Sequence, residues 1–90
     1  MIQSFKHKGL KLLYEKGSRK GVPPACAEKI ENVLSVLDVA KSVPSLKLPG
    51  LHPLKGTRKG EWGVTITGNW RVVFKIVEGH VCDVDYTDYH

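Results

Sequence analysis

The chain has 90 residues, of which 41% are hydrophobic and 26% charged, a balance typical of a soluble globular protein rather than a disordered one. No apolar run approaches the roughly 20 residues that a membrane-spanning helix needs, and the first residues lack the apolar stretch of a signal peptide. We therefore expect one small cytoplasmic domain over residues 1–90, without a membrane partner. Two cysteines cannot form a disulfide framework, so Cys26 and Cys82 are expected to be reduced core residues.

The net charge of +5 is unevenly distributed along the chain. Residues 1–59 carry twelve basic and four acidic side chains, whereas residues 60–90 carry two basic and five acidic ones. A basic front half suggests a polyanionic partner, most simply a nucleic acid. The plainer alternative is a solvated surface, because lysine is common on helix faces.

The first predicted element is a helix that Ser4 caps and that runs to about Lys16, with Gly17 as its C-terminal stop. Its apolar positions, spaced i, i+4, i+7 and i+8, are Phe5, Gly9, Leu12 and Leu13.

A second helix is predicted after Pro23-Pro24, since proline suits the first turn of a helix. The helix should end before Pro44. Its apolar positions are Ala27, Ile30, Val33, Leu34, Val36 and Leu37.

Residues 46–60 are rich in glycine and proline and predict a loop, with one short strand around His52. The apolar period then changes to two in the segments 62–66, 70–76 and 81–86, with turns at 68–69 and 78–79. Hairpin-linked strands after two helices indicate an α+β fold in which the helices pack on one face of a small, mainly antiparallel sheet. Trp62 and Trp70 lie on the apolar phase of their strands and are expected in the core.

Several catalytic motifs are absent from the sequence. No segment matches a phosphate loop or a dinucleotide fingerprint, so no cofactor is expected, and no CxxC or HExxH spacing recommends a metal site. What remains is a set of polar residues that the fold would bring near one another: His52, Lys55, Arg71, Asp88, Tyr89 and His90.

Four segments carry a resemblance to a known family. They are IQSFKHKGLK at residues 2–11, LHPLKG at 51–56, GNWRVVF at 68–74 and DYTDYH at 85–90. Together they resemble the HigB toxins, the plasmid-maintenance killer branch of the RelE-like superfamily, and the similarity runs from Met1 to His90.

The resemblance implies a toxin of a type II toxin–antitoxin system that cleaves mRNA in the ribosomal A site. It implies a HigA-like helix-turn-helix antitoxin, contact with 30S ribosomal RNA, and binding of operator DNA only through the antitoxin. RNA supplies its own nucleophile, the 2′-hydroxyl, so this chemistry requires a base, cationic donors and an acid but no metal.

The family match assigns these roles to particular residues. His52 would be a proton-transfer residue rather than a solvated loop histidine, and Lys55 a phosphate contact rather than a surface charge. Arg71 would bind phosphate; the alternative is an exposed strand arginine paired with Asp83 or Asp85.

The C-terminal Asp88-Tyr89-His90 matches the catalytic terminus of the family. His90 is expected to fold back beside His52, although chain ends are normally frayed. Tyr89 would stack on a nucleobase or donate a hydrogen bond, and Asp88 would orient a histidine or transfer a proton.

Further basic residues are candidates for RNA contacts: Lys6, Lys8, Arg58 and Lys59, and beyond them Lys11, Arg19 and Lys20. Two other functions fit the same sequence. One is a non-catalytic RNA-binding inhibitor of translation, and the other is a corepressor that acts only with its antitoxin.

Overall fold

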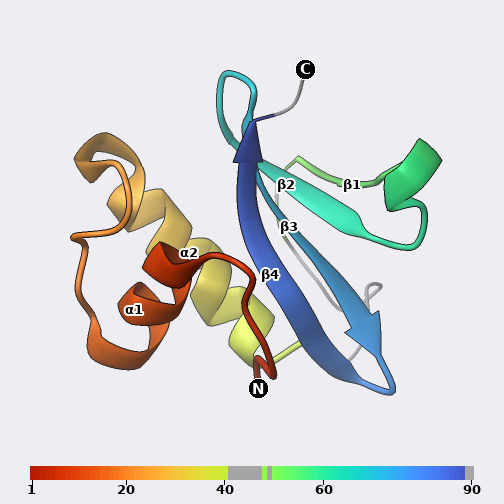
Figure 1. Cartoon of the computed structure of the whole chain (residues 1–90), viewed down its shortest axis with the longest axis horizontal. Helices are drawn as coiled ribbons and strands as arrows, with labels where there is room; N and C mark the ends of the chain where they lie inside the picture. The colour runs from red at the N-terminus through yellow and green to blue at the C-terminus, as the bar shows by residue number, and fades with distance from the viewer. Residues whose placement is uncertain (41–47, 49, 89–90) are drawn as a thin grey trace.

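The structure is a computed structural model that describes residues 1–40, 48 and 50–88. Its elements in chain order are α1 (Lys8–Lys16), η1 (Pro24–Cys26), α2 (Ala27–Asp38), β1 (Leu51–Pro53), η3 (Gly56–Arg58), β2 (Trp62–Thr67), β3 (Trp70–Val77) and β4 (His80–Asp88). The four strands form one antiparallel sheet in the order β1-β2-β3-β4, and both helices lie on one face of it (Figure 1). The predicted α+β architecture is therefore confirmed. None of the helices in these ranges has the length and apolar character needed to cross a membrane.

The sheet grows from successive hairpins, as the period-two segments predict. Val64 lies opposite Val72, which lies opposite Tyr86, and all three are buried toward the helices. The turns at 68–69 and 78–79 are also as predicted. The short strand around His52 is β1, whose central residue lies opposite Gly63.

The start of α1 differs from the prediction, because Ser4 does not cap it. Residues 2–6 instead run parallel to β4 along its outer edge and exchange backbone hydrogen bonds with it. The Ser4 hydroxyl accepts the backbone N–H of Asp83 at 2.9 Å, at a bulge where Asp83 has φ +54°. The helix begins only at Lys8, where the Nδ1 atom of His7 accepts the N–H of Leu10 at 3.1 Å. The backbone groups at the edge of β4 need hydrogen-bond partners, and Ser4 provides them. Ser4 is therefore not available to cap α1.

The later start also changes which residues of α1 are buried. Leu10 is fully buried, whereas Leu12, predicted on the apolar face, is 36% exposed. Gly9 is buried as predicted, for a reason specific to glycine: a Cβ there would lie 2.1 Å from the carbonyl oxygen of Gly21. Gly17 ends the helix with φ +68°, as predicted.

The second helix follows the prediction closely. Pro24 begins a 3-10 turn rather than the α-helix itself, and α2 then ends well before Pro44. Its buried residues are Ala27, Ile30, Val33, Leu34 and Leu37. The stripe packs on β2 and completes the core between the helices and the sheet.

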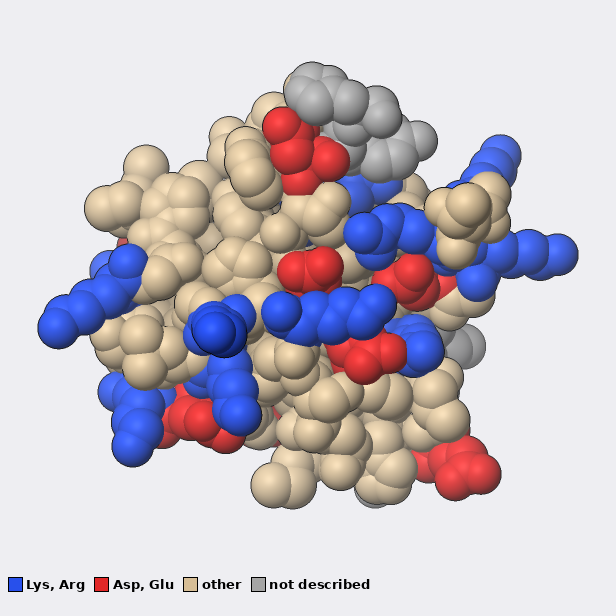
Figure 2. Space-filling view, in the orientation of Figure 1, with Lys and Arg blue, Asp and Glu red and all other residues tan. Residues whose placement is uncertain are grey.

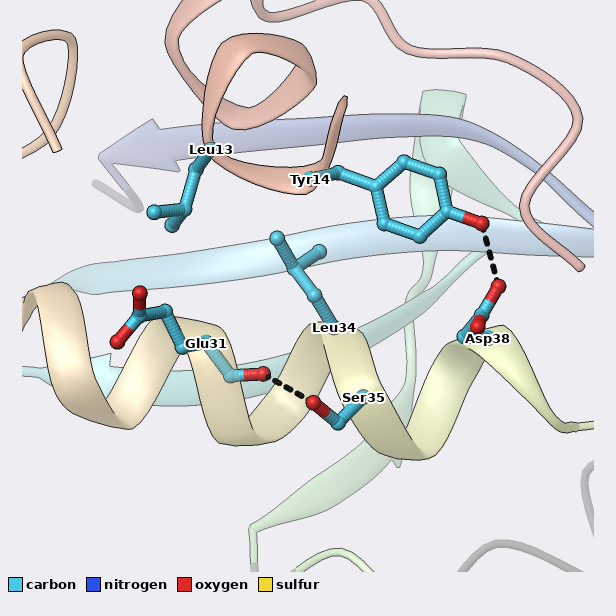
Figure 3. A pocket seen from close by; sticks show the side chains of 6 residues that line it. All are labelled: Leu13, Tyr14, Glu31, Leu34, Ser35 and Asp38. Carbon is cyan, nitrogen blue, oxygen red and sulfur yellow. Dashed lines mark hydrogen bonds between the residues drawn. The ribbon is translucent and has the colours of Figure 1, made fainter. Parts of the chain in front are cut away.

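The two helices are also joined at the surface (Figure 3). The hydroxyl of Tyr14 on α1 donates a hydrogen bond to the carboxylate of Asp38 on α2, above a floor that includes Leu13 and Leu34. This bond to a carboxylate and partial burial raise the pKa of Tyr14. The bond therefore links the two helices in addition to their contacts in the core.

Two predictions about core residues need correction. Trp62 is half-buried against the core as expected, but Trp70 is 40% exposed and stacks on Tyr86 at the end of the sheet. Cys26 is free and packs against the core, whereas the equally free Cys82 is half-exposed and lies outside it. Trp70 is the first residue of β3, where an apolar phase no longer ensures that a helix covers the residue, and Cys82 directly follows the buried Val81 on β4, so it does not share the buried phase of that strand.

Candidate active site

The candidate active site is a cleft of about 260 Å³ on the face of the sheet that the helices leave uncovered. Val72 on β3 is buried toward the helices, so its neighbour Arg71 projects to the opposite face. There Arg71 meets β1 and the η3 turn. The cleft is lined by His52, Pro53, Leu54, Lys55, Arg58 and Arg71.

His52 and Arg71 form the centre of this cleft. The Nη1 atom of Arg71 lies 2.9 Å from Nε2 of His52, and the Nδ1 atom of His52 lies 2.9 Å from the carbonyl oxygen of Gly50. A guanidinium only donates and a carbonyl only accepts. Both bonds therefore require one neutral tautomer of His52, with the proton on Nδ1 and the lone pair of Nε2 directed at Arg71.

The absence of a side chain at Gly63 makes room for this pair. Gly63 is the register partner of His52, on the strand between β1 and β3. A Cβ at this position would lie 3.1 Å from Leu54 Cδ2, 3.3 Å from Arg71 Cδ and 3.6 Å from His52 Cε1. Sequence reasoning missed Gly63 and Leu54 as site residues, because neither carries a polar group that would mark it.

Basic residues of the η3 turn surround the cleft. Lys55 precedes the turn, and Arg58 at its end pairs with Glu61 at 3.3 Å. The backbone N–H of Leu54 donates to the carbonyl of Glu61 and closes the loop. Figure 2 shows blue side chains gathered at this end of the molecule, at the right of the view. The cleft is therefore suited to an anion.

Of the three predicted C-terminal site residues, the structure describes only Asp88. Asp88 ends β4 as the register partner of Trp70, next to the pairing of Arg71 with Thr87, so it lies at the same end of the sheet as Arg71. Tyr89 and His90 lie outside the described residues, and their predicted placement remains a prediction.

The predicted RNA contacts fall into two groups. Arg58 lines the cleft and Lys59 follows it directly, exposed. Lys6, in the segment along the edge of β4, and Lys8, the first residue of α1, are also exposed, but neither lines the cleft. Asp83 forms an ion pair with Lys75 at 2.9 Å, and the alternative pairing of Arg71 with Asp83 or Asp85 remains a prediction.

A four-stranded antiparallel sheet with two helices on one face is a fold that occurs in a solved structure. The fold matches the crystal structure of YafQ from E. coli strain BL21(DE3), with a TM-score of 0.62 at 16% identity, over 98% of this chain and 91% of that one.

The sequence comparisons are more specific. The family described as RelE-like toxin of type II toxin-antitoxin system HigB matches residues 3–90. The Endoribonuclease HigB of Proteus vulgaris is 46% identical over 92 residues, covering all of both chains. This chain therefore belongs to the HigB-like family of RelE-like toxins.

Proposed function

We propose that this toxin is a ribosome-dependent endoribonuclease that cleaves mRNA in the A site by attack of a 2′-hydroxyl on the adjacent phosphate. The observation that carries the proposal is the His52–Arg71 pair, a neutral imidazole held 2.9 Å from a guanidinium in a basic cleft. The full-length relative named as an endoribonuclease supports the activity.

His52 has the geometry of the general base. In the tautomer that its two bonds require, Nε2 carries a lone pair able to accept the proton of the 2′-hydroxyl. The Nδ1–H stays bound to the Gly50 carbonyl, which fixes the ring and stabilises the imidazolium that forms. Before RNA binds, Arg71 occupies Nε2; a phosphate that engages the guanidinium would release it.

The cations of the cleft would stabilise the transition state. Arg71 offers a planar fork of donors for two non-bridging phosphate oxygens, and Lys55 offers a point charge beside it. As the 2′-oxygen bonds to phosphorus, the negative charge on these oxygens grows, and preorganised donors bind that charge most strongly.

The departing 5′-oxygen needs a proton when its bond to phosphorus breaks, leaving a 2′,3′-cyclic phosphate and a 5′-hydroxyl. By the family resemblance, Asp88, Tyr89 and His90 supply or orient this acid. No metal ion is required for either proton transfer, because the RNA provides the nucleophile and the protein provides the charges.

The proposal extends to partners. As a member of a type II toxin–antitoxin family, the chain would be neutralised by an antitoxin, which we infer to be HigA-like, and would reach operator DNA only through it. We assign contacts with 30S ribosomal RNA to Lys6, Lys8, Arg58 and Lys59. We infer that the protein acts in the cytoplasm, where ribosomes translate mRNA.

Primer extension on mRNA from cells that express the wild type, His52→Ala or the exposed Lys16→Ala control tests the proposal. The wild type and the control should give discrete cuts, and His52→Ala should reduce them by about a hundredfold or more. A matched transcript without a start codon should remain uncut. Growth arrest without cuts would indicate a non-catalytic inhibitor, and absence of arrest a corepressor; either result would refute the proposal.

A further inference from the structure

One acidic residue lies beside the cationic cleft, where a negative charge is unexpected. Glu61 is the sole acidic residue of the sequence between Asp38 and Glu78, and it directly precedes β2. Its carboxylate lies 3.3 Å from the Nη1 atom of Arg58, which lines the cleft, whereas Glu61 itself does not line it. A negative charge at this position opposes the binding of an anion, so Glu61 should have a role that offsets this cost.

Glu61 closes a loop, residues 54–61, that has its own small core. Leu54 is 8% exposed and lies over Gly63, whose register partner Val73 is fully buried. Both Leu54 and Val73 lie outside the core between the helices and the sheet. The N–H of Leu54 donates to the carbonyl of Glu61, and the N–H of Glu61 donates to the carbonyl of Arg58, both at 3.0 Å. The backbone of the loop is therefore held in place without the carboxylate.

The ion pair between Glu61 and Arg58 has the geometry to orient the arginine. The side chain of Glu61 is 17% exposed and that of Arg58 is 39% exposed, so the carboxylate lies deeper and the guanidinium nearer to solvent. Nη1 donates to the carboxylate, and a guanidinium has five N–H donors in one plane, so the others can serve an anion in an orientation that Glu61 fixes. A partly exposed ion pair adds little stability, so stability alone does not account for the carboxylate.

We propose that Glu61 is a positioning residue, which holds the guanidinium of Arg58 at the wall of the cleft so that Arg58 binds a phosphate of RNA. The inference rests on the proposed action on RNA. A long side chain that is ordered only when its ligand binds costs about fivefold in affinity, and an anchor that orders it beforehand removes this loss. Glu61 acts through Arg58 and touches neither the RNA nor the reacting atoms.

Two substitutions at Glu61 separate its charge from its hydrogen bond. Glu61→Ala and Glu61→Gln remove the same negative charge, but the glutamine keeps an oxygen that can accept the bond from Arg58. Affinity is measured on ribosomes whose message carries 2′-O-methyl groups at the A-site codon, which prevent cleavage. Glu61→Ala should bind about fivefold more weakly than Glu61→Gln. On a cleavable message, the difference should appear in the toxin concentration required and not in the cleavage rate at saturation.

Two further variants control for the total charge and for the structure of the loop. Glu28 is exposed on α2, on the opposite face of the sheet from the cleft, and Glu28→Ala should bind like the wild type. In an Arg58→Ala background, Glu61→Ala should cause no further loss, because the two residues act as one unit. A fivefold loss in that background would show that Glu61 only supports the loop, and would overturn the proposal. Equal affinity of Glu61→Ala and Glu61→Gln, or tighter binding of Glu61→Ala, would overturn it too.

The same measurements identify the phosphate and separate this proposal from that of the cleavage site. A loss in Glu61→Ala on vacant ribosomes would assign the phosphate to ribosomal RNA, and a loss only on programmed ribosomes would assign it to the message; either supports the proposal. Full cleavage by His52→Ala would refute the proposed function and leave a difference between the two Glu61 variants standing. Equal affinity of these variants, with cleavage that depends on His52, would overturn the role of Glu61 alone.

Discussion

The substitution Gly63→Ala would perturb the proposed active site without removing any of its polar groups. The new methyl would lie 3.1 Å from Leu54 Cδ2 and 3.3 Å from Arg71 Cδ, closer than ordinary contact. Leu54 is buried and has little freedom to move, so the guanidinium would shift by a few tenths of an ångström. The 2.9 Å contact between Arg71 and His52 would change with it.

The size of the effect follows from this displacement. A misplacement of about 1 Å in an active site costs roughly a hundredfold in rate, so a few tenths should cost about fivefold. The stability cost should be about 1 kcal/mol, at the lower end of overpacking effects. We therefore expect single-turnover cleavage on programmed ribosomes to slow about fivefold while the protein remains folded.

The matched control is Ile30→Val, which removes a methyl group from the core beneath α2. It should lower stability by a similar amount, about 1 kcal/mol, and leave the cleavage rate unchanged. If Gly63→Ala cleaves as fast as the wild type, or if both variants slow equally, the assignment of the catalytic pair to this cleft is wrong.

Three further predictions concern stability. The hydrogen bond from Lys75 lowers the pKa of Asp83. The stability that this ion pair contributes is therefore complete above the ordinary aspartate pKa of about 3.9 and is lost as the pH falls through the lower folded value. In Asp83→Asn, the free energy of unfolding measured by urea melts should therefore change less with pH below about pH 4. Because the pKa of Tyr14 is raised, its hydrogen bond to Asp38 stabilises the fold below about pH 10, and this contribution is lost as the pH rises through the higher folded pKa. Tyr14→Phe should lower the free energy of unfolding by about 1 kcal/mol at neutral pH and leave it unchanged in strong alkali. An unchanged stability of Tyr14→Phe at neutral pH would contradict this. Gly9→Ala should lower the melting temperature despite alanine's better helix propensity, because its Cβ would lie 2.1 Å from a facing carbonyl oxygen; a higher value would contradict the packing.

The parts of the fold with strong periodicity could be predicted from the sequence. The stripe of α2 and the alternation in β2 and β3 each specify which face is buried, and together they require a sheet with helices on one side. The start of α1 could not be predicted, because Ser4 serves the edge of β4, a contact between residues 79 positions apart. Likewise, nothing in the chain near Trp70 indicates that it lies beyond the cover of the helices.

The candidate site shows the same division. The resemblance identified His52, Lys55 and Arg71, and the structure brings all three to one cleft. It could not specify the tautomer of His52, which depends on the Gly50 carbonyl and on Arg71, nor the space provided by Gly63. The contact of Arg71 with His52 and the space at Gly63 depend on how β1, β2 and β3 pair, and a sequence motif does not specify that pairing.

The central claim is that His52 and Arg71 direct a 2′-hydroxyl against the adjacent phosphate of mRNA. The most direct measurement is single-turnover cleavage on ribosomes whose message carries one 2′-deoxy nucleotide at the cut position, beside an all-ribose control. We predict that the wild type cuts only the control and leaves a 2′,3′-cyclic phosphate, and that His52→Ala and Arg71→Lys slow this cut by about a hundredfold or more and by about tenfold, respectively. Cleavage of the deoxy message at the control rate, or full activity in His52→Ala, would contradict the account.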